Sequence, residues 1–164
     1  MLLTVLLTGR NKKKDEDIFL QREQTMRKVL EENQYVRFLG IEILDLREGY
    51  CLARMKNSKE LLNPYGMFHG GSLYSLADIA AGTAACMSGH YVTTVSGTMN
   101  FLLPAEGTEY VYCEAEKLRI GGHIAVFDVR LKDEEGNVLD SGEFIFYITG
   151  HKVQAGRGGT GGDS

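Results

Sequence analysis

The sequence predicts an α+β domain in which an antiparallel sheet of about six strands wraps around one long buried helix. A helix is expected over residues 72–87, where apolar and small residues occupy nearly every face, so that this helix must be buried. One apolar helix beside this many strands can be covered only if the sheet curves around it. The strand-like runs are residues 41–46, 50–55, 91–103, 109–119, 124–132 and 138–148.

The elements ahead of the buried helix follow from periodicity and from turn residues. Apolar residues recur at helical spacing among charges from Asp17 to Asn33, which predicts a peripheral amphipathic helix. The first two strands are joined by the turn Arg47-Glu48-Gly49. A long loop over residues 56–68, interrupted by Asn63-Pro64 and Gly66, leads into the buried helix.

The last four strands are expected to form a meander, because turn residues separate them at 104–107, 121–122 and 135–137. Small residues on the central helix should let the sheet approach it closely. These are Ala77, Ala80, Ala81, Gly82, Ala84 and Ala85.

The length of 164 residues suits a single domain. We expect a mobile leader over residues 1–16, one domain over 17–149, and a disordered Gly-rich tail over 150–164 that cannot bury apolar surface. The apolar start is too short to span a membrane, and the basic run follows it, the reverse of a signal peptide. No membrane partner is therefore expected.

Charge and cysteine content narrow the function classes. The net charge is −4 and the basic residues are scattered, so there is no positive electrostatic field to attract nucleic acid. Nucleic acid is therefore not expected as a partner. Three cysteines without a paired motif do not resemble a disulfide framework. We therefore expect a reducing compartment, the cytoplasm or an organelle matrix.

Asp78 is the only Asp, Glu, Lys or Arg between Leu61 and Ala105, and it falls in the middle of the predicted buried helix. An unpaired carboxylate there would cost several kcal/mol unless it were hydrogen-bonded, neutralised or facing a cavity. Two interpretations remain open. Asp78 satisfies a local backbone group or pairs with a distant Arg, or it is a catalytic carboxylate.

The segment His69-Gly70-Gly71-Ser72 leads directly into the same helix. Amides at a helix N-terminus, unobstructed by side chains at the glycines, can stabilise a developing oxyanion. The alternative is a Gly-rich turn with Ser72 as N-cap. Asp78 lies two turns beyond Gly71, roughly 10 Å along the axis, so one helix cannot place both groups on one carbonyl. A two-fold dimer with antiparallel helices could, and the sequence permits it.

The end of the loop and the first part of the helix read Asn63-Pro64-Tyr65-Gly66-Met67-Phe68-His69-Gly70-Gly71-Ser72-Leu73-Tyr74-Ser75-Leu76-Ala77-Asp78. This string resembles the signature of the hotdog-fold acyl-CoA thioesterases of the PaaI-like group, which includes the mammalian thioesterase superfamily member 2 type. The resemblance continues through Asn100-Phe101-Leu102-Leu103-Pro104-Ala105 and the strands that follow. It implies a hotdog fold and hydrolysis of acyl-CoA to a free acid and CoA.

The resemblance also implies roles for individual residues. Asp78 corresponds to the family's general base or nucleophile, and Asn63 to the residue that holds the attacking water or the substrate carbonyl. His69 corresponds to the residue that orients the thioester, and the amide of Gly70 or Gly71 to the oxyanion donor.

A hydroxyl residue early in the strand after the helix often helps to place the water, and Ser96 occupies that position, with Thr94 and Thr98 expected on the same side. For the CoA moiety the resemblance points to a basic, Gly-containing turn. Its residues here are Lys117, Arg119, Gly121, Gly122 and His123, which could equally be solvated strand ends.

No metal and no cofactor is expected, since the histidines lack ligand spacing. The resemblance implies an acyl-CoA substrate, a homodimer that completes the site, and a homotetramer built as a dimer of dimers. A non-catalytic acyl-CoA sensor on the same fold and a purely scaffolding dimer are the alternatives from other classes. A hotdog dehydratase would carry a different catalytic pattern.

Overall fold

The computed structural model describes the backbone of residues 2–154 and the side chains of residues 12–154. In chain order the elements are α1 (Leu2–Glu32), α2 (Gln34–Leu39), β1 (Ile41–Arg47), β2 (Tyr50–Lys56), the 3-10 helix η1 (Lys59–Leu61), α3 (Gly70–Cys86), β3 (His90–Phe101), β4 (Tyr110–Ile120), β5 (Ile124–Lys132) and β6 (Val138–Lys152).

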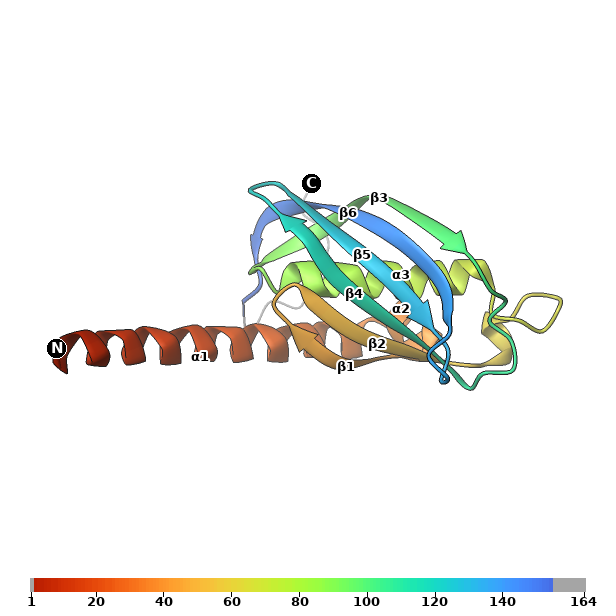
Figure 1. The fold of residues 1–164 in the computed structure, drawn as a ribbon, viewed down its shortest axis with the longest axis horizontal. Helices are drawn as coiled ribbons and strands as arrows, with labels where there is room; N and C mark the ends of the chain where they lie inside the picture. The colour runs from red at the N-terminus through yellow and green to blue at the C-terminus, as the bar shows by residue number, and fades with distance from the viewer. Residues whose placement is uncertain (1, 155–164) are drawn as a thin grey trace.

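The strands form one six-stranded antiparallel sheet in the order β1-β2-β4-β5-β6-β3, and the sheet curves around α3 (Figure 1). The predicted fold class, an antiparallel sheet around one buried helix with an N-terminal helix beside it, is confirmed. The predicted meander of four strands is wrong. Only β4, β5 and β6 are consecutive neighbours, while β3 pairs with β6 at the edge opposite β1. The reason is that α3 separates β2 from β3 and passes beneath the sheet, which carries the chain to the far edge.

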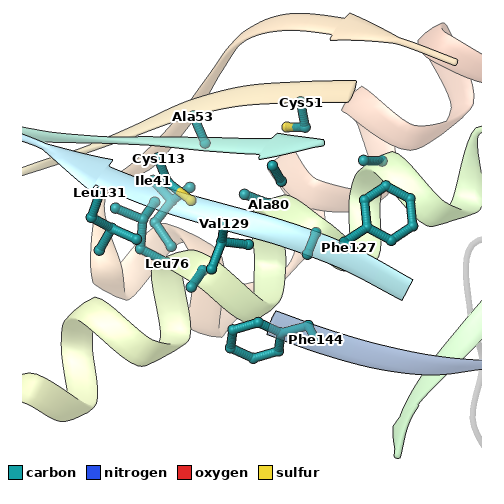
Figure 2. Close-up of a cluster of buried hydrophobic side chains, with 14 of the residues drawn as sticks. Ile41, Cys51, Ala53, Leu76, Ala80, Cys113, Phe127, Val129, Leu131 and Phe144 are labelled. Atoms are coloured by element: carbon teal, nitrogen blue, oxygen red, sulfur yellow. The ribbon is translucent and has the colours of Figure 1, made fainter. Parts of the chain in front are cut away.

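The core lies between α3 and the concave face of the sheet. Leu76 and Ala80 of α3 are fully buried, and Figure 2 shows them facing side chains from β4 and β5. Alanine along α3 permits this close approach. β3 is also tightly packed at Gly97, where a Cβ would strike the Tyr74 hydroxyl of α3 and the Phe144 ring of β6.

The N-terminal helix begins at Leu2, earlier than the expected Asp17, and its first half extends beyond the domain (Figure 1). Its second half is attached to the core by Met26, which is buried, and by Arg22, whose guanidinium donates to the Met87 carbonyl at 3.3 Å. No helix among the described residues is both long enough and apolar enough to cross a membrane.

The short helix α2 was not predicted from the sequence. Asn33, expected to end the preceding helix, instead caps α2, since its side-chain oxygen accepts from the amides of Tyr35 and Val36. At the other end of the chain, β6 continues to Lys152, past the expected boundary at residue 149. Residues 155–164 of the expected tail lie outside the described residues.

Candidate active site

His69, rather than Ser72, is the N-cap of α3. Its Nδ1 accepts a hydrogen bond from the Gly71 amide at 2.9 Å, and its carbonyl accepts from the amides of Ser72 and Leu73 at 2.9 and 3.2 Å. The Ser72 hydroxyl donates to the His69 carbonyl at 2.7 Å. Three of the first amides of the helix are therefore already satisfied locally.

The Gly70 amide differs from these three. It donates to no acceptor among the described residues, and it lies at the positive end of the helix dipole. A Cβ at this position would come within 3.3 Å of the Phe101 ring, which lies against the glycine. Of the two glycines predicted as oxyanion donors, Gly70 therefore has the available N–H, whereas the N–H of Gly71 is occupied by His69.

Asn63 organises the loop that precedes α3. Its Oδ1 accepts from the amides of Tyr65 and Met67 at 2.9 and 3.2 Å, and its own amide donates to the Met67 carbonyl at 2.8 Å. The His69 amide then donates to the Leu61 carbonyl at 2.8 Å, which closes the loop beside the helix start. With Oδ1 committed, the Nδ2 group of Asn63 has no acceptor among the described residues, so it can serve as a donor.

Asp78 is half-buried in the middle of α3, and Thr94 of β3 donates to its Oδ1 at 2.7 Å. Burial raises the pKa of the Asp78 carboxyl above its ordinary value, and the hydrogen bond from Thr94 offsets part of that rise. None of the ion pairs among residues 12–154 includes Asp78. The carboxyl is thus a stronger base than an exposed aspartate, without a cation to neutralise it.

Thr94, and not Ser96, is the hydroxyl residue that reaches Asp78 within one protomer. A bulge interrupts β3, so that Thr94 pairs with Phe146 while Ser96 pairs with Ile145. Paired residues share a face of the sheet, and Phe146 faces the core, so Thr94 faces α3 and Ser96 faces away. The expectation that both hydroxyls lie on one side failed because strict alternation does not survive a bulge.

The candidate residues of one protomer thus form two separate groups. Asn63, His69 and Gly70 gather at the N-terminus of α3, while Asp78 and Thr94 lie two helical turns further on, a separation of roughly 10 Å. A single thioester carbonyl cannot contact both groups of the same protomer. The structure of one protomer therefore does not bring the candidate residues together at one point.

The residues predicted to hold CoA are also divided. Gly121, Gly122 and His123 line a pocket of about 450 Å³ between the β4–β5 turn and the end of β6. Lys117 and Arg119 are exposed and do not line it. The Lys117 side chain instead lies over the β1–β2 turn, and its amide donates to a carbonyl of that turn at 2.8 Å.

Neither metal ligands nor a reactive thiol mark another centre in the described part of the chain. Residues 12–154 contain no group of three or more His, Cys, Asp or Glu side chains that could hold a metal ion. The three cysteines are buried and unpaired. Burial raises the pKa of Cys51 to about 12 and that of Cys86 to about 11, so neither is a nucleophile near neutral pH.

Comparison with known proteins agrees with this fold. The thioesterase superfamily model matches residues 65–139. Acyl-coenzyme A thioesterase PaaI of Escherichia coli is 27% identical over 112 residues, 68% of this chain and 80% of the relative. Its solved structure superimposes with a TM-score of 0.77 over 82% of this chain and 98% of that chain, at 23% identity.

Two further proteins add to the comparison. Putative esterase ComA2 of Bacillus subtilis is 31% identical over 106 residues, 62% of this chain and 82% of the relative. A hypothetical thioesterase from Streptococcus pneumoniae, solved with coenzyme A, is 27% identical, with a TM-score of 0.65 over 68% of this chain and 88% of that chain.

A six-stranded antiparallel sheet curved around one helix, together with these matches, defines a hydrolase of thioesters with the hotdog fold. The chain belongs to the thioesterase superfamily, and its relatives place it with the PaaI-like proteins.

Proposed function

We propose that the protein is an acyl-CoA thioesterase, which hydrolyses an acyl thioester to the free acid and CoA. The observation that carries this proposal is the carboxyl of Asp78, which is half-buried, is held by Thr94 and forms no ion pair with any described residue. The name of the E. coli relative and the coenzyme A in the S. pneumoniae structure support CoA as the thiol component.

The proposed mechanism begins with the thioester carbonyl. Its oxygen accepts hydrogen bonds from the Gly70 amide and the Nδ2 of Asn63, and the helix dipole stabilises the negative charge that develops there. His69 donates from Nε2 to the bound substrate, because its Nδ1 already accepts from Gly71.

Asp78 then acts in one of two ways. It removes a proton from a water molecule that attacks the carbonyl carbon, or it attacks that carbon itself to give an anhydride that water opens. In both routes the C–S bond breaks with its electron pair on sulfur, and the CoA thiolate takes up a proton. A carboxyl whose pKa is raised by burial suits the first role, because it accepts a proton more readily than an exposed aspartate.

The two half-sites must come from different subunits, so activity should require a homodimer. β3 is an edge strand of the sheet, with an unpaired backbone edge. Large apolar side chains are exposed along it and beyond its end, namely Val95 (60%), Phe101 (56%), Leu102 (55%) and Leu103 (51%). A second copy paired there in two-fold symmetry would bring its Asp78 toward Gly70. Assembly of two dimers into a tetramer stays a prediction.

The pocket beside Gly121, Gly122 and His123 is the proposed site for the CoA headgroup. The His123 ring stacks on Tyr147 with an interplanar angle of 7° and centroids 6.3 Å apart, which fixes its orientation beside the pocket. Arg119 of β4, next in sequence to Ile120 of the pocket lining, would supply charge for the phosphates.

The experiment is a thiol-release assay on a panel of acyl-CoAs, with wild type and Asp78→Asn in parallel. We expect turnover by wild type and a loss of about 10²–10⁴-fold in kcat for the variant. Wild type that binds an acyl-CoA without releasing thiol would instead identify a sensor. Equal rates for the two proteins would exclude Asp78 as a catalytic residue.

Subunit complementation tests the shared site directly. Asp78→Asn and Asn63→Asp chains disable opposite halves, so a mixed dimer retains one intact site out of two. With random exchange, half of the dimers are mixed, and activity should return to about one quarter of wild type. If the mixture stays inactive although subunit exchange has been demonstrated, both groups of site residues act within one subunit.

A further inference from the structure

The short helix α2 exposes two aromatic rings on one face. Val36 and Leu39 are buried, at 5% and 3% exposure, whereas Tyr35 and Phe38 are 55% and 62% exposed. The two aromatics are three residues apart, so they project from the same side of the helix. Two large rings left in solvent together differ from single exposed apolar residues, which need no explanation.

This aromatic face is attached to α3 at a specific point. The Tyr35 hydroxyl lies 2.7 Å from the Ser75 Oγ, and Ser75 donates its own proton to the Gly71 carbonyl at 2.9 Å. Tyr35 is therefore the donor to Ser75. Ser75 is four residues after Gly71 and three before Asp78, so these three residues lie on one face of α3.

That face of α3 is contacted from two elements. β3 contacts it through the hydrogen bond from Thr94 to Asp78, and α2 contacts it through Tyr35. The position of α2 is fixed at both ends, since Asn33 caps its start and Gly40 ends it with a left-handed φ of 65°. The Tyr35 ring is thus held against Ser75, three residues before Asp78 on α3, and Phe38 projects from the same side of α2.

We propose that Tyr35 and Phe38 form a wall of the acyl-binding pocket and determine which acyl groups the enzyme accepts. The inference rests on the proposed thioesterase function. An acyl group whose carbonyl lies between Gly70 of one subunit and Asp78 of the other must continue along the open face of α3, which α2 borders. Ring faces there bury apolar acyl carbons, so chains long enough to reach α2 gain affinity that an acetyl group cannot.

The test compares kcat/KM for dodecanoyl-CoA and acetyl-CoA in wild type and Phe38→Ala. We expect about a tenfold loss for dodecanoyl-CoA and a change within about twofold for acetyl-CoA. Tyr35→Phe keeps the ring and removes the bond to Ser75, so it should reduce the dodecanoyl rate less than Tyr35→Ala does. Leu20→Ala, on an exposed residue of α1 at 52%, is the control and should change neither substrate.

Other outcomes would contradict the proposed role of Tyr35 and Phe38 in the acyl-binding pocket. An equal loss on both substrates, no loss on either, or a wild type that accepts only acetyl-CoA would overturn it while leaving the thioesterase function intact. Dissociation of the Phe38→Ala dimer in sedimentation would assign the ring to the subunit interface and also overturn it. A wild type inactive on every acyl-CoA would contradict the proposed function itself, which this comparison therefore tests separately.

Discussion

Burial of Asp140 makes the stability of the fold depend on pH. Its side chain is fully buried, and neither carboxyl oxygen has a hydrogen-bond partner among residues 12–154. In the strand ladder it pairs with Leu131 on one side and Phe101 on the other. Desolvation raises the pKa of Asp140 to about 6, because nothing in this apolar row stabilises the charge.

The sign and size of the effect follow from linkage. An unfolded aspartate titrates near 3.9, so below about pH 4 both states hold the proton and Asp140 carries no penalty. As pH rises from about 4 to 6, the unfolded chain releases the proton first, and stability falls. Above the folded pKa of about 6 the whole penalty applies. A shift of about two pKa units corresponds to about 3 kcal/mol in the free energy of unfolding.

We therefore expect Asp140→Asn to change the free energy of unfolding more favourably at pH 7.5 than at pH 4. The difference between the two changes should be up to about 3 kcal/mol. The assay is urea unfolding of both proteins at half-unit steps across this range. Asp133→Asn is the control, because hydrogen bonds from Asn137 lower the pKa of Asp133 and its replacement should destabilise at neutral pH. Parallel stability curves for wild type and Asp140→Asn would refute the reasoning.

Three further substitutions probe the site and its scaffold. Asn63→Asp keeps the oxygen that accepts from the loop amides but removes the Nδ2 donor, so unfolding should be unchanged while kcat falls about 10²-fold or more. Thr94→Val removes the hydrogen bond that lowers the pKa of Asp78, so the acid limb of the pH profile of kcat/KM should move to higher pH. If that limb does not move, Asp78 is not the group that titrates in it. Gly97→Ala forces a methyl group against the Tyr74 hydroxyl and should cost roughly 1–3 kcal/mol in thermal unfolding, with an unchanged Tm counting against that contact.

The sequence predicted the elements better than their arrangement. Periodicity located α3 and all six strands, because a buried helix and half-buried strands leave strong patterns. The position of β3 depended on how the chain passes beneath the sheet, which no local pattern records. The bulge that turns Ser96 away from Thr94 was equally invisible, since it is defined by pairing with β6.

The two buried acids show why one was found and the other missed. Asp78 stands in a long stretch without any other acidic or basic residue, so its isolation was visible in the sequence. Asp140 lies between charged residues such as Asp133 and Glu143, so no comparable isolation marks it in the sequence. Only its register, on the inward face beside Leu131, reveals its burial.

Asp140 also has a neighbour in the proposed active site. Phe101, its partner in the β3–β6 ladder, lies with its ring against Gly70, so the buried acid is one strand away from the proposed oxyanion donor. It makes no hydrogen bond to any site residue, however, and its side chain is inaccessible. We therefore expect Asp140→Asn to raise stability at neutral pH while kcat and KM stay within about twofold of wild type, measured on the same preparation. A loss of kcat in a better-folded protein would mean that the charge acts on the helix start through Phe101, and that the instability is retained because catalysis uses it.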